Sequence, residues 1–457
     1  MTAPTNISQE IAEKITAHHG DGIVEQSQEV LVRHQLCGVS PSVLVEPTTP
    51  EQVAGVLALA HQEGWHVVPW GSGQGMANGR PPRRYDIALS VNKLKQIIDY
   101  DQENLTLTAE AGATLSAANQ AVARGHQFLP LGWSDDSATL GGLISSNQLP
   151  PKRLLYGDPR DLLLGIRVAL PDGRLVRYGR KVIKNVAGYD MNKLFLGSQG
   201  MMGVIVEVTC KLFALPDEEA IVVAGFSGQE QATRAAGELL ASKLLPAYVY
   251  LLDGPSAHAF CSAQPIANLE AKVLLVAGFD GRSVTLRRQR SDSTALCQRH
   301  GATQLETLST LSPGARRVMA GQPANFTGHQ ETEVFVRLGM PTGALLNWMN
   351  RLPEDTSMLQ PTGFAIDYGA GCLRVSFPAA VEEKKLAGWL AKTRTELVQQ
   401  DGFAVVEQAP ANIFEQISPW ETTGAMEVMR RLQIHFDPNG VMCPERFLSA
   451  GASDQER

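Results

Sequence analysis

The chain has 457 residues, of which 44% are hydrophobic and 19% charged, and its formal net charge is −7. This composition is that of an ordinary globular protein, and the length predicts two or three domains. An acidic balance without a long basic run argues against nucleic acid as a partner. The longest apolar runs are too short to span a bilayer, so we expect no transmembrane segment.

The cysteines and histidines predict neither a metal centre nor an iron–sulfur cluster. The six cysteines are scattered without a CxxC pair, and the ten histidines show no HxH or HExxH spacing. No signal peptide is recognisable at the N-terminus, so we expect reduced thiols in an unexported, cytoplasmic chain.

The first part of the chain predicts an α/β segment that begins after a polar extension. Residues 1–40 have a helical pattern and are predicted to form an N-terminal helical extension. A strand is expected at 42–46 and a helix at 50–63, with Thr49 as the N-cap and Pro50 at the first helical position. Strands and helices then alternate up to about residue 216.

The region 217–410 shows the same order of elements twice. Each half is predicted as β-α-β-β-α-β, the ferredoxin-like pattern. Two such halves can share one antiparallel sheet with helices on one face. A helix through 429–436, ended by Asp437-Pro438-Asn439-Gly440, is expected in the last segment, 411–457.

Three glycine-containing blocks carry the chemical signal. The first, 69–79, follows a strand, and clustered glycines expose consecutive backbone amides that can bind phosphate oxygens; the structural alternative is a glycine-rich turn. It fits neither the Rossmann fingerprint nor the P-loop. The second block, 130–147, contains Gly141-Gly142, and the third, 184–205, has glycines every third residue before a β-branched run. Tyr189 and Lys193 fit the YxxxK pair of short-chain dehydrogenases, but the glycine spacing that chemistry needs is missing.

Together the blocks resemble the FAD-binding domain of the vanillyl-alcohol-oxidase and p-cresol-methylhydroxylase (PCMH) superfamily, over residues 40–216. Within it the chain is similar to the FAD-binding second subunit of bacterial glycolate oxidase (glycolate dehydrogenase), through 184–190, 156–165 and the ending 436–446. The resemblance implies an α+β fold. A two-subdomain PCMH-type FAD-binding domain (41–216) would be followed by an α+β cap domain with an antiparallel sheet (217–410) and a helical segment (411–457) that returns to the FAD domain.

The resemblance also implies which residues contact FAD. The first block would wrap the pyrophosphate, the second would line the phosphate and ribose side, and the third would approach the flavin and adenosine by its backbone. These residues are Trp70, Gly71, Ser72, Gly73, Gln74, Gly75, Met76, Thr139, Gly141, Gly142, Ser145, Gly197, Gly200, Gly203, Val204 and Ile205. Asn185, Gly188 and Asp190 would shape the third block. The first loop has no histidine, so FAD should be bound non-covalently. Cys443 and Glu445 depart from the family's tail, which leaves a C-terminal contact open.

The activity implied is oxidation of a small 2-hydroxy acid, glycolate or D-lactate. An arginine would bind the substrate carboxylate, and a histidine or similar base would take the hydroxyl proton. The candidates are Arg337, Tyr368 and Arg374 on cap strands and His329 on a loop; the alternative is that each is an ordinary strand or loop residue.

The resemblance implies partner chains as well. Nothing in the sequence matches the His-rich metal signature of the catalytic subunits, and no cysteines are grouped for an iron–sulfur relay. The chain would therefore be the FAD-binding subunit of a complex with a catalytic flavoprotein subunit and an iron–sulfur subunit, cytoplasmic or held at the inner membrane through them. The alternatives are a non-catalytic FAD-holding or assembly subunit, and a stand-alone FAD-dependent dehydrogenase of another alcohol or hydroxy acid.

Overall fold

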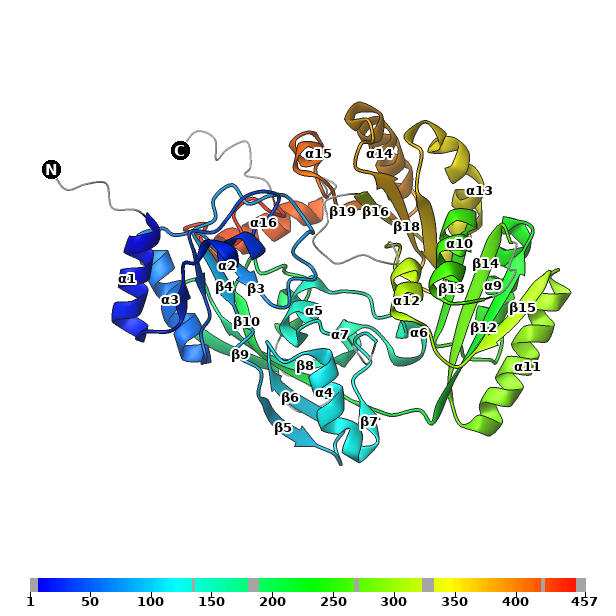
Figure 1. The fold of residues 1–457 in the computed structure, drawn as a ribbon, viewed down its shortest axis with the longest axis horizontal. Helices are drawn as coiled ribbons and strands as arrows, with labels where there is room; N and C mark the ends of the chain where they lie inside the picture. The colour runs from blue at the N-terminus through cyan, green and yellow to red at the C-terminus, as the bar shows by residue number, and fades with distance from the viewer. Residues whose placement is uncertain are drawn as a thin grey trace. The chain divides into compact units, whose positions relative to one another are not determined.

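The structure, a computed structural model, describes residues 7–133, 136–179, 189–266, 271–322, 333–420 and 424–448. By its contacts the chain divides into two compact units (Figure 1). Unit 1 consists of Met1–Pro150, Gly157–Leu215 and Thr422–Arg457, and unit 2 of Pro151–Tyr156 and Pro216–Glu421. No helix within the described ranges is long and apolar enough to cross a membrane.

The first layer of unit 1 is a four-stranded sheet in the order β1-β2-β4-β3. Strands β2, β4 and β3 are parallel, and β1, from the predicted N-terminal extension, adds an antiparallel edge. Helix α3 begins as predicted: Thr49 Oγ1 accepts a hydrogen bond from the Gln52 amide at 3.2 Å, and Gly64 ends the helix in the left-handed region. The elements are α1 (Ile7–His19), β1 (Val24–Glu25), α2 (Gln28–Arg33), β2 (Val43–Val45), α3 (Pro50–Glu63), β3 (Val67–Trp70) and β4 (Ile87–Ser90).

Helix α1 is part of the core of this layer. Ile11 and Ile15 are fully buried and pack with apolar side chains of α3 and β2. Because these two isoleucines lie four residues apart, they lie on the same face of the helix. The N-terminal residues therefore stabilise the first sheet as well as covering it.

The second layer of unit 1 is a five-stranded antiparallel sheet in the order β5-β6-β10-β8-β9. Strand β10 lies at its centre and begins at Val204, directly after Gly203, the last glycine of the third block. The elements of this layer are β5 (Ile97–Asp101), β6 (Thr106–Glu110), α4 (Leu115–Val122), α5 (Leu140–Ser146), α7 (Pro159–Leu162), β8 (Leu163–Ala169), β9 (Leu175–Gly179), α8 (Asn192–Phe195), β10 (Val204–Lys211) and α16 (Gly424–Phe436). Strands β7 (Gln127–Phe128) and β11 (Phe213–Ala214) form a separate two-stranded sheet.

Unit 2 is built on one eight-stranded antiparallel sheet in the order β15-β12-β14-β13-β17-β18-β16-β19. The two halves have the same strand order and join where β13 pairs with β17. The duplicated ferredoxin-like pattern is therefore confirmed, and the fold is α+β. The elements are α6 (Arg153–Tyr156), β12 (Glu218–Phe226), α9 (Gln229–Ala241), β13 (Tyr248–Asp253), α10 (Gly254–Ala263), β14 (Val273–Gly281), α11 (Ser283–Arg299), β15 (Gln304–Leu308), α12 (Pro313–Met319), β16 (Glu333–Gly339), α13 (Leu345–Asp355), β17 (Gly363–Asp367), β18 (Cys372–Pro378), α14 (Glu383–Val398), β19 (Phe403–Gln408) and α15 (Ala411–Gln416).

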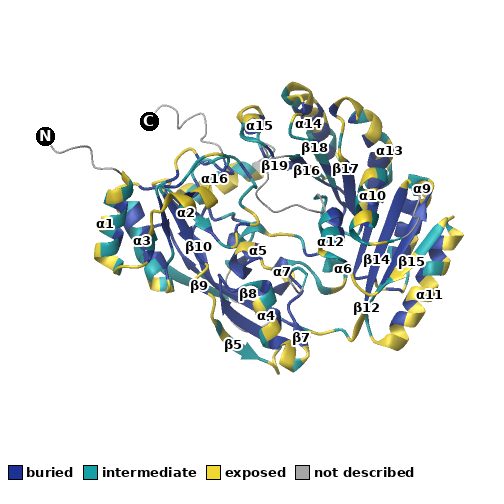
Figure 2. Ribbon diagram, viewed as in Figure 1, coloured by how far each residue is buried: buried dark blue, intermediate teal, exposed yellow. Residues whose placement is uncertain are grey.

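The two faces of this sheet differ in chemistry. One face packs against α9, α11, α13 and α14 to form a continuous apolar core, and the strands appear as the buried part of the unit in Figure 2. Because side chains alternate along a strand, the residues between the core positions belong to the opposite face. That face has buried apolar residues such as Leu274 and Val276 on β14. Towards the other half of the sheet it carries the charged and hydroxyl side chains of Tyr250, Asp367, Arg374, Arg337 and Glu407, and this part is called the polar face below.

Candidate functional site

The first glycine loop leaves β3 at Trp70 and has a row of available backbone amides. Among the hydrogen bonds of the described residues, none has an amide of residues 71–75 as its donor. Gly73 has a φ of 86°, which favours glycine, and a Cβ built on Gly75 would meet nothing within 4 Å. Consecutive free amides beside open space form a cradle suited to phosphate oxygens.

The three glycine blocks lie together in unit 1. A Cβ on Gly71 would lie 2.2 Å from Thr139 Oγ1, so the first block touches the second through a position where only glycine fits. Gln74 Nε2 also donates to Ser137 Oγ at 2.8 Å. The third block joins the second through the Gly197 and Gln199 amides, which donate to the carbonyls of Ile144 and Ser145 at 3.0 and 2.9 Å.

Some of the predicted contact residues have structural roles in this arrangement. The Gly141 amide donates to the Ala111 carbonyl, and the Gly142 amide to Thr139 Oγ1, the N-cap of α5. A Cβ on Gly203 would lie 2.6 Å from the Ala169 carbonyl oxygen. The side chains of Val204 and Ile205 are buried in the cores on either side of β10. The first loop, rather than the N-terminus of α5, therefore has the free amides.

The start of the third block lies only partly in the described structure. Lys184, Asn185, Val186, Ala187 and Gly188 lie outside the described residues. Tyr189 is 94% exposed, and Lys193 Nζ donates to the carbonyls of Arg160 and Leu163. Lys193 therefore binds carbonyl groups at the end of α7, where it stabilises the fold.

The C-terminal residues return to β3 and the first loop. The Val67 amide donates to the Val441 carbonyl at 2.8 Å, and the Cys443 amide to the Val67 carbonyl at 2.9 Å. The Asp437 carboxylate accepts hydrogen bonds from the amides of Val441 and Met442, which shapes the turn. The sequence left the contact of this tail open, and the structure shows that it packs directly against the strand that carries the first loop.

Arg446 is a residue of this tail whose role the sequence did not reveal. Its guanidinium donates hydrogen bonds to the carbonyls of Met76, Asn78 and Arg80 at 2.7, 2.6 and 3.2 Å. These contacts fix the second half of the first glycine loop. The sequence showed only one arginine in the ending 436–446, at least 366 residues from the carbonyl groups that it binds, so no local pattern could indicate this contact.

The polar face of unit 2 brings two of the predicted catalytic residues together. Arg337 on β16 and Arg374 on β18 are directly paired in the sheet register. Their Nε atoms donate to the two carboxylate oxygens of Glu407 on β19, at 2.5 and 3.2 Å. Burial works to raise the pKa of Glu407, but Arg374 and Arg337 hold it below its ordinary value. Two guanidinium groups therefore share the single carboxylate of Glu407.

A buried acid lies on the same face at the junction of the two halves. Asp367 on β17 is 4% exposed, and its carboxylate accepts hydrogen bonds from the Tyr250 hydroxyl at 3.4 Å and the Ala370 amide at 3.1 Å. Burial raises the pKa of Asp367 to about 6. Sequence patterns did not single out Asp367, Tyr250 or Glu407, because their meeting depends on strand order.

Tyr368 does not belong with this cluster, contrary to its place among the catalytic candidates. It follows Asp367 directly, so its side chain lies on the other face of the sheet, within the apolar core beside α9. Burial there raises the pKa of its hydroxyl. His329 lies outside the described residues.

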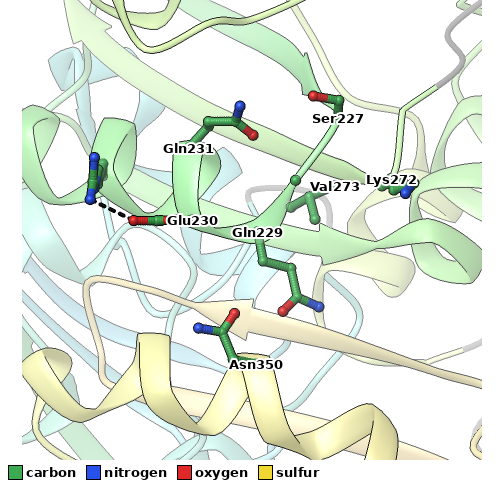
Figure 3. A pocket seen from close by; sticks show the side chains of 9 residues that line it. Ser227, Gln229, Glu230, Gln231, Lys272, Val273 and Asn350 are labelled. Atoms are coloured by element: carbon green, nitrogen blue, oxygen red, sulfur yellow. Dashed lines mark hydrogen bonds and ion pairs between the residues drawn. The ribbon is translucent and has the colours of Figure 1, made fainter.

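A pocket of about 610 Å³ lies elsewhere in unit 2, at the start of α9 (Figure 3). Its lining is polar, and Glu230 in it is paired with Arg234. Gly228 caps α9 without a side-chain hydrogen bond. The pocket contains none of the predicted site residues, and we assign it no role. In the described part of the chain, no group of three or more His, Cys, Asp or Glu could hold a metal ion.

Comparison with known families agrees with this arrangement. Residues 41–179 match the family described as "FAD binding domain", and residues 215–331 match "FAD linked oxidases, C-terminal domain". The chain therefore contains an FAD-binding domain followed by a region that matches the C-terminal domain of FAD-linked oxidases, and FAD is its cofactor. The free amides and open space of the first loop fit the diphosphate of this cofactor.

The chain is also similar to individual proteins whose activities are named. The chain is 29% identical over 272 residues to the glycolate oxidase subunit GlcD of Bacillus subtilis, covering 59% of this chain and 58% of that protein. It is 24% identical over 434 residues to a probable mitochondrial D-lactate dehydrogenase of Danio rerio, covering 91% and 86%. A D-lactate dehydrogenase of Archaeoglobus fulgidus is 32% identical over 204 residues, with 45% and 46% covered. The chain thus spans about half the length of the GlcD and archaeal relatives that it matches.

Solved structures show the same fold at low identity. Against p-cresol methylhydroxylase the TM-score is 0.74 at 15% identity, with 97% of each chain covered. Against an alkyldihydroxyacetonephosphate synthase it is 0.69 at 17% identity, with 97% of this chain and 86% of that chain covered. The predicted PCMH-type fold is confirmed.

Proposed function

We propose that this chain is the FAD-binding subunit of a glycolate-oxidase-like complex and takes part in the oxidation of a small 2-hydroxy acid, glycolate or D-lactate. The names of the relatives support this class of substrate. The observation that carries the proposal is the pair of arginines on the polar face, whose two guanidinium groups share the single carboxylate of Glu407. A substrate carboxylate would supply a second anion for these two guanidinium groups.

The residues of the polar face would have separate roles in binding the substrate and in accepting its proton. Arg374 and Arg337 bind and orient the substrate carboxylate, while Glu407 holds their guanidinium planes in place. Asp367, hydrogen-bonded to Tyr250, is suited to take up the proton of the substrate hydroxyl because its pKa lies near neutrality. When bound, FAD supplies the acceptor for the hydride from C2. We drop Tyr368 from the set because its ring lies in the apolar core.

The first glycine loop would bind the FAD diphosphate non-covalently through the amides of residues 71–75, with the other predicted contact residues of the three blocks around the rest of the cofactor. The loop has no histidine that could form a covalent link, and its Gln74 donates a hydrogen bond to Ser137. Electrons would pass to a catalytic flavoprotein subunit and an iron–sulfur subunit. We place the complex in the cytoplasm, free or attached to the inner membrane through these partners.

A second candidate is a subunit that holds FAD while a partner chain oxidises the substrate. The sharing of Glu407 favours it, because both arginines already have a carboxylate partner. One absorption measurement distinguishes the two candidate functions. Absorption of the purified chain is recorded anaerobically before and after adding glycolate or D-lactate. Bleaching of the flavin bands supports the catalytic proposal, whereas a spectrum that stays oxidised contradicts it and favours the FAD-holding subunit.

Arg374→Met tests the residue assignment. We expect the substrate concentration needed for half-maximal bleaching to rise about 100-fold, which is the scale for loss of one partner of a charge-assisted contact. Arg351→Met is the matched control, since Arg351 pairs with Asp355 and Glu396 away from the polar face. Equal effects of the two variants would contradict the assignment.

A further inference from the structure

Arg446 is a buried cation whose partners carry no formal charge. Its side chain is 3% exposed, and the groups that accept its hydrogen bonds are the carbonyls of Met76, Asn78 and Arg80. The neighbouring carboxylate, Glu445, pairs with Arg83 at 2.9 Å. Among the ion pairs of the described residues, none includes Arg446. A buried charge that lacks a counter-charge is costly, so an anionic partner is expected.

Two ionisable groups close to Arg446 do not supply that counter-charge. They are the Cys443 thiol and the Tyr85 hydroxyl. Burial raises the pKa of Cys443 to about 12 and that of Tyr85 further still, so both groups are neutral at pH 7. Burial also lowers the pKa of the Arg446 guanidinium, which is the sign expected for a cation without an anionic neighbour.

The loop held by Arg446 is the loop with free amides. Its carbonyls at 76, 78 and 80 accept from Arg446, while its amides at 71–75 donate to no described residue. The turn is closed by hydrogen bonds from the Met76 and Asn78 amides to the carbonyls of Gly73 and Gly75. The cation and the free amides are therefore parts of one short loop, and both favour an anion there.

Apolar side chains near Arg446 exclude solvent from its guanidinium group. Trp70, Tyr85 and Phe447 pack with Leu31 and Leu36 of the N-terminal segment into one apolar cluster. The His34 ring lies edge-on to Trp70, with 4.7 Å between the ring centroids. Low polarity strengthens the attraction between the guanidinium and an anion on the loop.

We propose that Arg446 is a positioning residue for FAD: it holds the first glycine loop in its binding conformation, and the FAD diphosphate bound by that loop balances its charge. This inference rests on the proposed binding of the diphosphate at residues 71–75. It assigns to the C-terminal tail a share in cofactor affinity, although the tail contributes none of the glycine motifs.

The test compares the affinity of the apoprotein for FAD in four chains: wild type, Arg446→Lys, Arg446→Gln and Arg83→Gln. Lysine keeps the charge with fewer directed donors, and glutamine keeps an amide donor without the charge. Arg83→Gln removes an exposed guanidinium near the same loop and serves as the matched control. Binding is followed by quenching of flavin fluorescence, and riboflavin, which lacks phosphate, is titrated in parallel.

We expect FAD to bind about 10-fold more weakly to Arg446→Lys and about 100-fold more weakly to Arg446→Gln, on the scale of lost charge-assisted hydrogen bonds. Riboflavin affinity should change less than 2-fold in all variants, and Arg83→Gln should match wild type. Equal losses in the lysine and glutamine variants, or equal losses for riboflavin and FAD, would overturn the charge assignment. Failure of the wild-type apoprotein to bind FAD would contradict the proposed function instead.

Discussion

The buried carboxyl of Asp367 makes the stability of unit 2 depend on pH in an unusual direction. Burial moves its pKa from 3.8 to about 6, so the folded protein holds this proton more tightly than the unfolded chain. The stabilising contribution is fully present below the unfolded pKa and is lost as the pH rises through about 6. At 1.36 kcal/mol per pKa unit, the loss amounts to about 3 kcal/mol.

Asp367→Asn should remove this pH dependence. The amide is nearly isosteric with the neutral acid, can accept from the Ala370 amide and can donate to Tyr250. The variant and wild type should therefore have similar free energies of unfolding near pH 4. At pH 7.5 the variant should be more stable by about 3 kcal/mol, or about 6–12 °C in melting temperature.

The free energy of unfolding of the apoprotein is measured from pH 4 to pH 8 by urea denaturation monitored through tryptophan fluorescence. The melting temperature is measured by calorimetry at the same pH values. Asp217→Asn, at an exposed position of the same unit, is the control and should track wild type at each pH. The difference between Asp367→Asn and wild type should grow between pH 4 and pH 6 and then level off. A difference that stays constant over the whole range would refute the assignment of a raised pKa to Asp367.

Three further outcomes are expected. Gly75→Ala should retain FAD because a Cβ there meets no protein atom within 4 Å. Gly75→Asp should yield colourless protein because it brings negative charge to the amides that would bind phosphate. Full occupancy of the aspartate variant by FAD would contradict the assignment of the loop. Lys152→Met should lower the free energy of unfolding of unit 2 by about 3–5 kcal/mol in urea denaturation, because it leaves the buried carboxylate of Asp280 without its cation. The control Lys385→Met removes an exposed ion pair and should lower that free energy by under about 1 kcal/mol. Deletion of residues 1–40 should lower the melting temperature and speed the loss of FAD on gel filtration, since Ile11 and Ile15 are fully buried in unit 1; unchanged retention would contradict this.

Much of the fold could be predicted because local signals agreed with it. The helix predicted at 50–63 is α3, since Thr49, Pro50 and Gly64 mark its ends without help from distant residues. The helices α10 and α12 were overlooked although they begin with the same kind of signal. Asp253 and Ser312 cap them, each close to a proline. Their short apolar patterns offered too few turns to stand out from a loop.

The site could be predicted only in part, because its decisive contacts join distant segments. The glycine blocks indicated a phosphate site, but the sequence could not distinguish Gly75, which faces open space, from Gly71, which is glycine because Thr139 lies against it. Arg337 and Arg374 were chosen by residue type and strand position. Their sharing of Glu407 depends on a strand order that local patterns do not encode. Tyr368 was chosen by residue type, without the alternation that puts its side chain with Phe364 and Ile366 in the apolar core.

The pairing of Val67 with Val441 and Cys443 has a consequence for biosynthesis. Both ends of the chain belong to unit 1, and all of unit 2 is translated between them. While the ribosome is still making unit 2, β3 lacks this partner and the first loop lacks Arg446. Stable loading of the flavin must therefore wait until residues 441–446 have left the exit tunnel. A nascent chain that is truncated between residues 206 and 440 would carry all three glycine blocks and should still bind the flavin only weakly.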